Sequence, residues 1–360
     1  MNIKKATLVL TAITIMVGCT SAPTAIISTE TTNTQIATST PVGTYKFTIA
    51  TSTDWYADGK GLSDEINTQI PVIFSDIRET ESLMESVDLL TSGKAGMAFV
   101  YDYHVVLANQ GKLMSAFPDA PMEKIAIKCG TEMTRPMFPD YAEAARIVLP
   151  LYEEQLHIVV SETSGITSVN DIKGKHISTG EAGSATEQQA RFIFAGLGID
   201  WETENSREQF GLSAAIEALE KGAIDAFFWS GPSTDAELSD FLNEKGIGFK
   251  LLPIAGYEAE KIIQANPGIF HKSKIPANTY NSNQEGVDVL ATTIVLAAME
   301  DFPIDHVLQT LTIFFNHSSA EWKSRFFANP KTSIAVLNAE AHSFLHKGAV
   351  DYFIEQGALK

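Results

Sequence analysis

Cysteine and basic residues are scarce in this sequence. Its 360 residues include 2 Cys, and 26 Lys and Arg stand against 44 Asp and Glu, so the formal net charge is -18. Two cysteines allow at most one disulfide and no cysteine-based zinc site. Nucleic-acid binders neutralise phosphates with clustered Lys and Arg, so the charge argues against DNA or RNA as a partner. At about 150 residues per domain, the length predicts about two domains.

The motifs of several enzyme classes are also missing. The chain beyond its N-terminal region has no G-x-S-x-G nucleophile elbow, no H-E-x-x-H, no P-loop and no strand-linked G-x-G-x-x-G. His342 and His346 are spaced to share a helix face, but zinc needs at least a third ligand, and nearby Glu340 belongs to no known pattern. We therefore expect neither a metal nor a cofactor. A hydrolase with a triad scattered along the chain is left as an alternative.

The N-terminus has the features of a lipoprotein signal peptide. Lys4 and Lys5 precede an apolar run over residues 6–17, which is 12 residues long, whereas crossing a bilayer takes about 20. The sequence Met16-Val17-Gly18-Cys19 resembles the bacterial lipobox. The resemblance implies removal of residues 1–18 and a lipid on Cys19, on a protein that faces the periplasm or the cell exterior. The alternative is an ordinary signal peptide with an incidental cysteine.

A Ser/Thr-rich segment follows. Eleven of the 24 residues from 20 to 43 are Ser or Thr, and Glu30 is the only charged one. Such a segment cannot bury enough apolar area to offset its chain entropy, so we expect a disordered tether over residues 19–43. With Cys19 lipidated, Cys129 has no disulfide partner. Its flanks, Ile125-Ala126-Ile127 and Gly130, indicate a strand end, and we interpret Cys129 as a buried thiol rather than a reactive one.

Beyond Gly43, short β-branched or aromatic runs alternate with helical stretches, which is typical of α/β layering. No repeat of about 20 to 50 residues occurs, which excludes a solenoid. The predicted strands cover residues 45–51, 71–77, 96–100, 124–129, 156–160, 176–179, 223–229 and 249–254. The predicted helices include residues 79–90, 185–195, 212–221 and 236–244.

Four loops that follow predicted strands are candidates for a ligand site, because open α/β sheets bind ligands at the carboxyl ends of their strands. In the loop from Gly180, backbone N–H groups at a helix N-terminus and the hydroxyls of Ser184 and Thr186 can bind a carboxylate. Alternatively, Ser184 only caps the helix. Aromatic residues near the strand ends line a cleft or belong to the core: Trp55, Tyr56, Tyr101, Trp229 and Tyr280. The four loops hold residues 51–56, 101–104, 180–186 and 230–233.

Blocks spread over residues 45–357 resemble the TAXI family of TRAP-transporter solute receptors. The longest block runs Leu-Pro-Leu-Tyr-Glu-Glu-Gln-Leu-His-Ile-Val-Val from Leu149, Ser-Gly-Ile-Thr-Ser-Val-Asn-Asp-Ile-Lys-Gly-Lys from Ser164, and Gly-Ser-Ala-Thr-Glu from Gly183. Four further blocks agree in order, at residues 83–100, 218–228, 275–280 and 345–353. His346 falls in the last block, which favours a structural role for it. Residues 112–141 are unlike the family and longer than its corresponding segment.

The resemblance implies an α/β fold of two lobes, the type II periplasmic binding protein fold, with each lobe a sheet flanked by helices and a ligand cleft between them. The first lobe would hold residues 44–158 and 286–360, and the second residues 159–285. The implied function is an extracytoplasmic receptor that captures a small organic acid or amino acid, such as glutamate. It would deliver this cargo to the small and large membrane subunits of a sodium-driven TRAP transporter. Such a receptor is not an enzyme, and we expect a monomer.

Together the loops and the resemblance predict a set of ligand-binding residues: Thr51, Ser52, Thr53, Trp55, Tyr56, Tyr101, Asp102, Gly183, Ser184, Ala185, Thr186, Trp229, Ser230, Gly231 and Tyr280. Acidic residues lie in or beside these loops, which contain no Arg: Asp54, Asp58, Asp102 and Glu181. Like charges 4 Å apart repel by about 4 kcal/mol at an effective dielectric constant of 20. We therefore predict that Asp102 meets a ligand ammonium, which favours an amino acid over a dicarboxylate unless a cation reaches the site from Arg78, Arg135 or His104.

Two functions without transport are further alternatives. A ligand sensor would bind a solute without a membrane transporter. A purely structural surface lipoprotein would bind no ligand at all.

Overall fold

The computed structural model describes residues 45–70, 72–112, 144–201, 203, 205–233, 235–245, 248–280, 285–317 and 319–360. The predicted signal peptide, lipobox and tether lie outside the described residues, as do the predicted strand at 124–129, Cys129 and Arg135. Within the described ranges, no helix combines the length and the apolar character needed to cross a bilayer.

The ten strands found among the described residues belong to one mixed sheet. Its order is β2-β1-β3-β10-β4-β7-β5-β6, while β8 pairs with β4 and β9 pairs with β10. Strand β1 pairs in parallel with β2 and β3, and β5 pairs in parallel with β6 and β7. Every pair that includes β4 or β10 is antiparallel. The strands are β1 Tyr45–Ser52, β2 Ile73–Thr80, β3 Met97–Tyr101, β4 Ala145–Ser161, β5 His176–Ser178, β6 Ser206–Glu208, β7 Ala226–Gly231, β8 Phe249–Leu251, β9 His271–Ile275 and β10 Val287–Met299.

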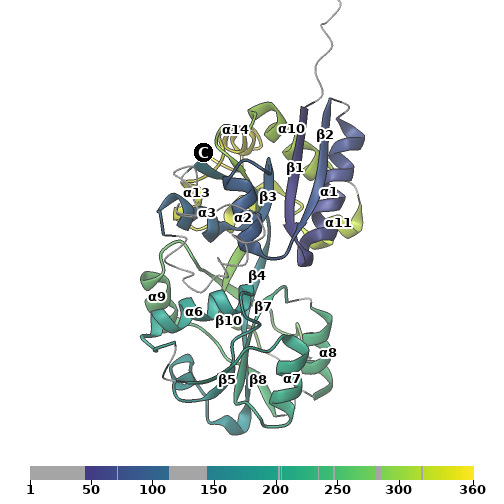
Figure 1. Cartoon of the computed structure of the whole chain (residues 1–360). Coiled ribbons are helices and arrows are strands. Elements are labelled where there is room, and N and C mark those ends of the chain that lie inside the picture. The colour runs from purple at the N-terminus through teal and green to yellow at the C-terminus, as the bar shows by residue number, and fades with distance from the viewer. Residues whose placement is uncertain are drawn as a thin grey trace, which may run out of the picture. The chain divides into compact units, whose positions relative to one another are not determined.

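Two lobes share the long strands β4 and β10, which run from one into the other (Figure 1). In the first lobe, β4 and β10 lie in the sheet together with β1, β2 and β3. In the second lobe, they lie in the sheet together with β5, β6, β7, β8 and β9. The first lobe contains α1 Tyr56–Gln69, α2 Leu83–Thr91, α3 Asp102–Asn109, α10 Ile304–Asn316, α11 Ala320–Arg325, α12 Pro330–Ala335, α13 Ala339–His342 and α14 Lys347–Glu355. The second contains α6 Ala185–Leu197, α7 Leu212–Glu220, α8 Ala236–Lys245 and α9 Gly256–Ala265. The predicted two-lobed α/β fold is therefore confirmed, while the residue boundaries given above for the lobes stay a prediction.

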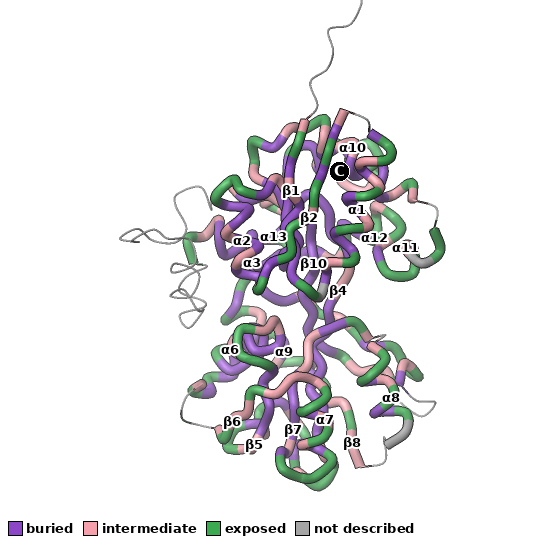
Figure 2. Tube along the Cα trace, turned by 45° about the vertical axis from the view of Figure 1, so that its right-hand side comes forward, coloured by how far each residue is buried: buried purple, intermediate pink, exposed green. Residues whose placement is uncertain are grey.

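Apolar patterning and end caps explain these elements. All five residues of β3 are buried, and the strands at the middle of the sheet are covered by helices whose outer faces are exposed (Figure 2). Helix α2 begins where the Ser82 side chain accepts the Glu85 N–H, and Leu83, Val87 and Leu90 bury one face of it. Helix α6 ends at Gly198, whose φ of 76° is the left-handed conformation that stops a helix.

The predicted strand and helix positions need several corrections. Strands β6, β9 and β10 were not predicted. Because β10 is buried on both faces, its run of Val, Leu, Ala and Thr shows no alternation that marks a strand. The helix predicted from residue 79 begins only at Leu83, since Glu79 and Thr80 end β2.

Two of the predicted loops are also regular structure. The residues after Tyr101 form the first turn of α3, and those from Trp229 to Gly231 belong to β7. Thr53–Trp55 form a 3-10 turn that leads into α1.

Candidate functional site

Polar side chains from both lobes meet beside the crossing strand β4. The Tyr101 hydroxyl at the end of β3 donates a hydrogen bond to Oε2 of Glu154 in β4. The Ser230 hydroxyl in β7 contacts the same oxygen at 3.4 Å, and the Ser230 N–H donates to Oγ1 of Thr186 at 3.0 Å. Glu154 thus connects the first lobe to the N-terminus of α6 in the second. We call this group, Tyr101, Glu154, Ser230 and Thr186, the junction cluster.

A second bridge joins the lobes beside this cluster. The Tyr103 hydroxyl donates to Oε1 of Gln188 at 3.1 Å, and Nε2 of His104 lies 3.3 Å from the same oxygen. Nδ1 of His104 accepts the N–H of Tyr101 at 3.4 Å, so its other ring nitrogen carries the proton. Burial lowers the pKa of His104 to about 4, which keeps the imidazole neutral at neutral pH. His104 therefore reaches the junction, but not as a cation.

Aromatic rings form the first-lobe wall of the junction. Trp55 packs edge-on against Tyr101, with ring centroids 5.4 Å apart, and Tyr101 stacks on Tyr103 at 4.9 Å. All three side chains are buried. Burial, followed by the charge of Glu154, holds the pKa of Tyr101 well above its usual value, so the phenol stays a hydrogen-bond donor. The three rings therefore pack against one another at the junction.

The loop before α6 is shaped by two glycines. Gly180 has φ +90° and Gly183 φ +77°, and a Cβ on Gly180 would come within 2.6 Å of the Thr186 Cβ. The Ser184 hydroxyl accepts the Glu187 N–H and therefore caps α6, and the carboxylate site predicted at the same loop stays a prediction. Ala185 and Thr186 are the first helical residues, whose N–H groups have no acceptor within a helix.

Asp102 fills a gap in the sheet at the lobe junction. On one side of β10, β3 pairs with it up to Ile294 and β9 pairs with it from Ala291, so Thr292 and Thr293 have no partner strand on that side, while on the other side they pair with β4. There Oδ1 of Asp102 accepts the N–H of Thr293 at 3.3 Å and that of Tyr103 at 2.8 Å. Its Oδ2 is buried without a hydrogen-bond partner among the described residues. Burial raises the pKa of Asp102 to about 7, although the nearby His271 acts against this.

The other charged residues named from the sequence lie in different parts of the structure. Asp58, buried in α1, pairs with Nε of the half-exposed Arg325 in α11 at 2.8 Å, and burial raises its pKa to about 6. Arg78 pairs with Glu85 at 3.3 Å on the surface of the first lobe. Glu181 is exposed. The side chain of Asp54 lies outside the described residues.

Trp229 and Tyr280 lie on the other side of the sheet from the junction cluster. Trp229 pairs with His157 across β4 and β7, and Ser230 pairs with Leu156, so the two pairs point to opposite faces. The Tyr280 hydroxyl bonds Nε2 of His157 at 2.6 Å, and both side chains are buried. Tyr280 belongs to the second lobe's core, and the structure does not bring it to Tyr101 or Thr186.

The remaining predicted residues surround the first loop and the end of β7. Thr51 and Ser52 are buried at the end of β1, Thr53 is exposed and Tyr56 is half-buried. Gly231 packs against the Trp229 ring. Two members of the junction, Glu154 and Gln188, were not predicted, while Tyr103 lies in a candidate loop but was not named as a ligand-binding residue. For Glu154 a signal existed, because Glu153, Glu154 and Gln155 interrupt the apolar residues between Leu149 and Val160.

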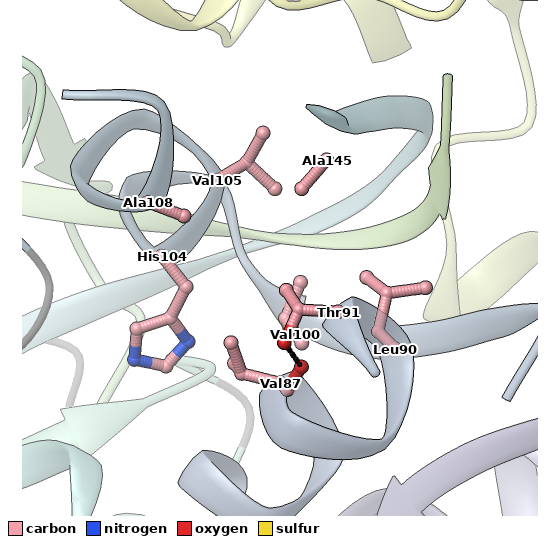
Figure 3. Close-up of a pocket in the computed structure, with 8 residues that line it drawn as sticks. All are labelled: Val87, Leu90, Thr91, Val100, His104, Val105, Ala108 and Ala145. Atoms are coloured by element: carbon pink, nitrogen blue, oxygen red, sulfur yellow. Dashed lines mark hydrogen bonds between the residues drawn. The ribbon is translucent and has the colours of Figure 1, made fainter. Parts of the chain in front are cut away.

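Two cavities lie apart from the junction cluster. One of about 10 Å³ lies between α2, α3 and the start of β4 (Figure 3), where Thr91 bonds the carbonyl of Val87 at 2.9 Å. A single water needs roughly 10–15 Å³, so this apolar void cannot hold a solute. A shallower one of about 190 Å³ is lined by Thr167, Ser168, Val169, Pro253, Ala255 and Glu258 of the second lobe.

A metal site does not emerge from the part of the chain that the structure describes, where no three His, Cys, Asp or Glu side chains are grouped to hold an ion. His346 instead caps α14, since its Nδ1 accepts the N–H of Gly348 at 3.1 Å.

Two α/β lobes that share antiparallel crossing strands, with polar side chains meeting at their junction, form the two-lobed α/β architecture that the sequence predicted. Residues 137–357 match the NMT1-like family, and the chain belongs to this family.

Several solved structures are similar to this chain. The periplasmic aliphatic sulphonate binding protein SsuA from Escherichia coli is 15% identical over 87% of this chain and 83% of its own, with a TM-score of 0.41. PhnD1 from Prochlorococcus marinus, in complex with methylphosphonate, is 9% identical over 88% and 100%, with a TM-score of 0.45. XAC2383 from Xanthomonas citri, bound to ATP, is 10% identical over 88% and 99%, with a TM-score of 0.47.

Proposed function

We propose that this protein is an extracytoplasmic solute receptor that closes around a small organic acid or amino acid. The observation that carries the proposal is the junction cluster, in which buried polar groups of both lobes meet beside a shared strand. Buried hydroxyls and carboxylates are costly unless they have partners. Separating the lobes would expose these groups for a solute, and closing them would bury it among hydrogen-bonding side chains and aromatic rings.

The ligand groups that we propose follow from the acceptors and donors at the junction. The N–H groups of Ala185 and Thr186 at the start of α6 suit a carboxylate. Oδ2 of Asp102 suits an ammonium, as the charge of the loops predicted. The two together favour an amino acid. An Asp102→Asn receptor that kept full affinity for an amino-acid ligand would refute the role of Asp102.

The first test is a thermal-shift screen of the purified protein against amino acids, 2-oxoacids and dicarboxylates. A ligand at 1,000 times its Kd adds about 4.1 kcal/mol to the stability of the folded state, which should raise Tm by several degrees. Mass spectrometry of the denatured protein would detect a ligand that copurifies. Recovery of the compound unchanged supports a receptor and not an enzyme. If no compound shifts Tm and none copurifies, the proposal fails.

We propose further that the loaded receptor docks on the small and large membrane subunits of a sodium-driven TRAP transporter, held near them by the lipid on Cys19. The support is the sequence resemblance to the TAXI receptors. The test is uptake of the identified solute into vesicles that contain the membrane subunits, with and without a sodium gradient. Uptake that needs ATP hydrolysis and ignores sodium would overturn the transporter class and leave the receptor role standing.

A further inference from the structure

A carboxylate of the protein itself folds back onto the loop that precedes α6. Oε2 of Glu187 accepts the N–H of Gly183 at 2.6 Å, and Oε1 accepts a hydrogen bond from Nε2 of Gln209 at 2.7 Å. Oε1 also lies 3.2 Å from Nη2 of Arg191 and 4.0 Å from Nη1 of Arg207. The Glu187 side chain is buried. Amide, guanidinium and backbone N–H donors at a helix N-terminus are the groups that bind phosphate and sulfate in proteins.

A tryptophan holds the two guanidinium groups in place. Both guanidinium groups lie over the Trp201 ring, whose centroid is 3.9 Å from Cζ of Arg207 and 4.5 Å from Cζ of Arg191. Such stacking fixes the planes of the guanidinium groups. The donors around Glu187 are therefore preorganised, and they would keep their positions if its carboxylate were removed.

We infer that Glu187 determines specificity by acting as an internal counter-anion: its carboxylate takes the donors that a phosphate, phosphonate or sulfonate group would need. The inference rests on the proposed receptor function and narrows its ligands to solutes without a dianionic or sulfonate group. To take the donors that Glu187 holds, a phosphate or sulfonate would have to displace its carboxylate, whereas the N–H groups of Ala185 and Thr186 proposed for the ligand carboxylate are separate donors. Gly183 is exposed, so solvent ions can reach the loop.

The test compares the affinity of variants for inorganic phosphate and sulfate. Glu187→Ala empties the position, and Glu187→Gln keeps its shape without the charge. Glu181→Gln is the matched control, because Glu181 is an exposed carboxylate of the same loop and its loss changes the net charge equally. Titration calorimetry and thermal shift at constant ionic strength, with chloride as the reference anion, measure the binding of each ion.

We expect phosphate and sulfate to bind Glu187→Ala at least about tenfold more tightly than the wild type, since one charge-assisted hydrogen bond changes affinity by about this factor. The affinity of Glu187→Gln for these anions should lie between those of the wild type and Glu187→Ala. The affinity of Glu181→Gln should match that of the wild type. If Glu187→Ala is unstable, phosphate or sulfate should restore its Tm while chloride does not.

Two outcomes would overturn the inference. In the first, Glu187→Ala binds phosphate and sulfate no better than Glu181→Gln does. In the second, its Tm falls and no anion restores it, which would leave Glu187 as a purely structural side chain. Both outcomes are independent of the solute screen on the wild type, so a failure here is distinguishable from a failure of the receptor function.

Discussion

The hydroxyl of Tyr103 in the first lobe donates a hydrogen bond to Oε1 of Gln188 in the second, over 3.1 Å. The two residues are 85 positions apart in the chain, and both are buried. Because this hydrogen bond joins elements of different lobes, we expect it to stabilise the closed state of the proposed receptor rather than the fold of either lobe alone.

Tyr103→Phe should weaken closure. A buried neutral hydrogen bond contributes about 0.5–1.5 kcal/mol, so affinity for the solute found in the screen should fall about twofold to tenfold. Titration calorimetry measures the affinity, and small-angle scattering without ligand should show a more open protein. Tyr352→Phe, a change in α14 of the first lobe, is the control. Equal affinities for Tyr103→Phe and the control would show that the contact does not couple to binding.

Gly180→Ala should destabilise the protein more than Gly222→Ala. Both glycines have positive φ, +90° and +66°, but only at Gly180 would the new Cβ come within 2.6 Å of a side chain, that of Thr186. The cost of a positive φ, about 1 kcal/mol, is common to both variants, so their difference reports the contact. Urea unfolding measures it. A difference near zero would mean that the loop relaxes freely.

Asp102→Asn should change how stability depends on pH. The pKa of Asp102 is about 7 in the folded protein against an ordinary 3.8. Between these values the folded state keeps a proton that the unfolded state has released, so the free energy of unfolding falls as pH rises. The variant should therefore gain on the wild type from about pH 4 to about pH 7, measured by urea unfolding. Asp76→Asn, which removes an exposed carboxylate, is the control variant. A constant difference across this range would contradict the prediction.

His157 should act on stability in the opposite direction. Burial lowers its pKa from 6.5 to about 4, and its Nε2 accepts the Tyr280 hydroxyl. Between these values the unfolded state binds a proton that the folded state does not, so stability rises with pH. His157→Gln should flatten this part of the profile, though not entirely, because His104 has a similarly lowered pKa. NMR titration of the His157 ring is the direct check, and a midpoint near 6.5 would refute it.

Cys19→Ala should release the protein from the membrane fraction. The lipobox reading predicts that a lipid on Cys19 is the anchor and that the tether has no membrane affinity of its own. Fractionation of cells followed by immunoblotting measures the distribution, and incorporation of labelled fatty acid tests the lipid directly. Ser21→Ala, a change two residues further on, is the control. Wild-type-like membrane association of Cys19→Ala would exclude lipid anchoring through this residue.

Local sequence patterns were enough to predict much of the fold. β1, β5, α6, α7 and α8 lie within a few residues of their predicted positions, because their apolar periodicity and caps are local. β10 was missed because both its faces are buried. The longer crossing strand β4 was predicted only over residues 156–160, although it spans Ala145–Ser161. Residues in the middle of a sheet carry no polar face from which a strand boundary could be read.

The candidate site was predicted less completely than the fold. Tyr101, Thr186 and Ser230 were named from strand ends and a helix start, and the structure joins them. Their link, Glu154, comes from the middle of a strand, where sequence reasoning expects core. Tyr280 was placed with them because it is aromatic and ends a family block, but its partner is His157. Whether these residues bind a solute stays a prediction until the screen is done.

The sequence by itself determined the α/β alternation, the acidic charge that argues against nucleic acid, the glycine and serine pattern of the α6 loop, and a resemblance that predicted two lobes. These features depend on composition and on neighbours a few residues apart. Only the tertiary structure decided which acceptor each donor meets: that Glu187 takes the Gly183 N–H, and that Asp102 fills the gap beside Thr293. Both depend on distances between groups brought together by folding, and local periodicity carries no information about those distances.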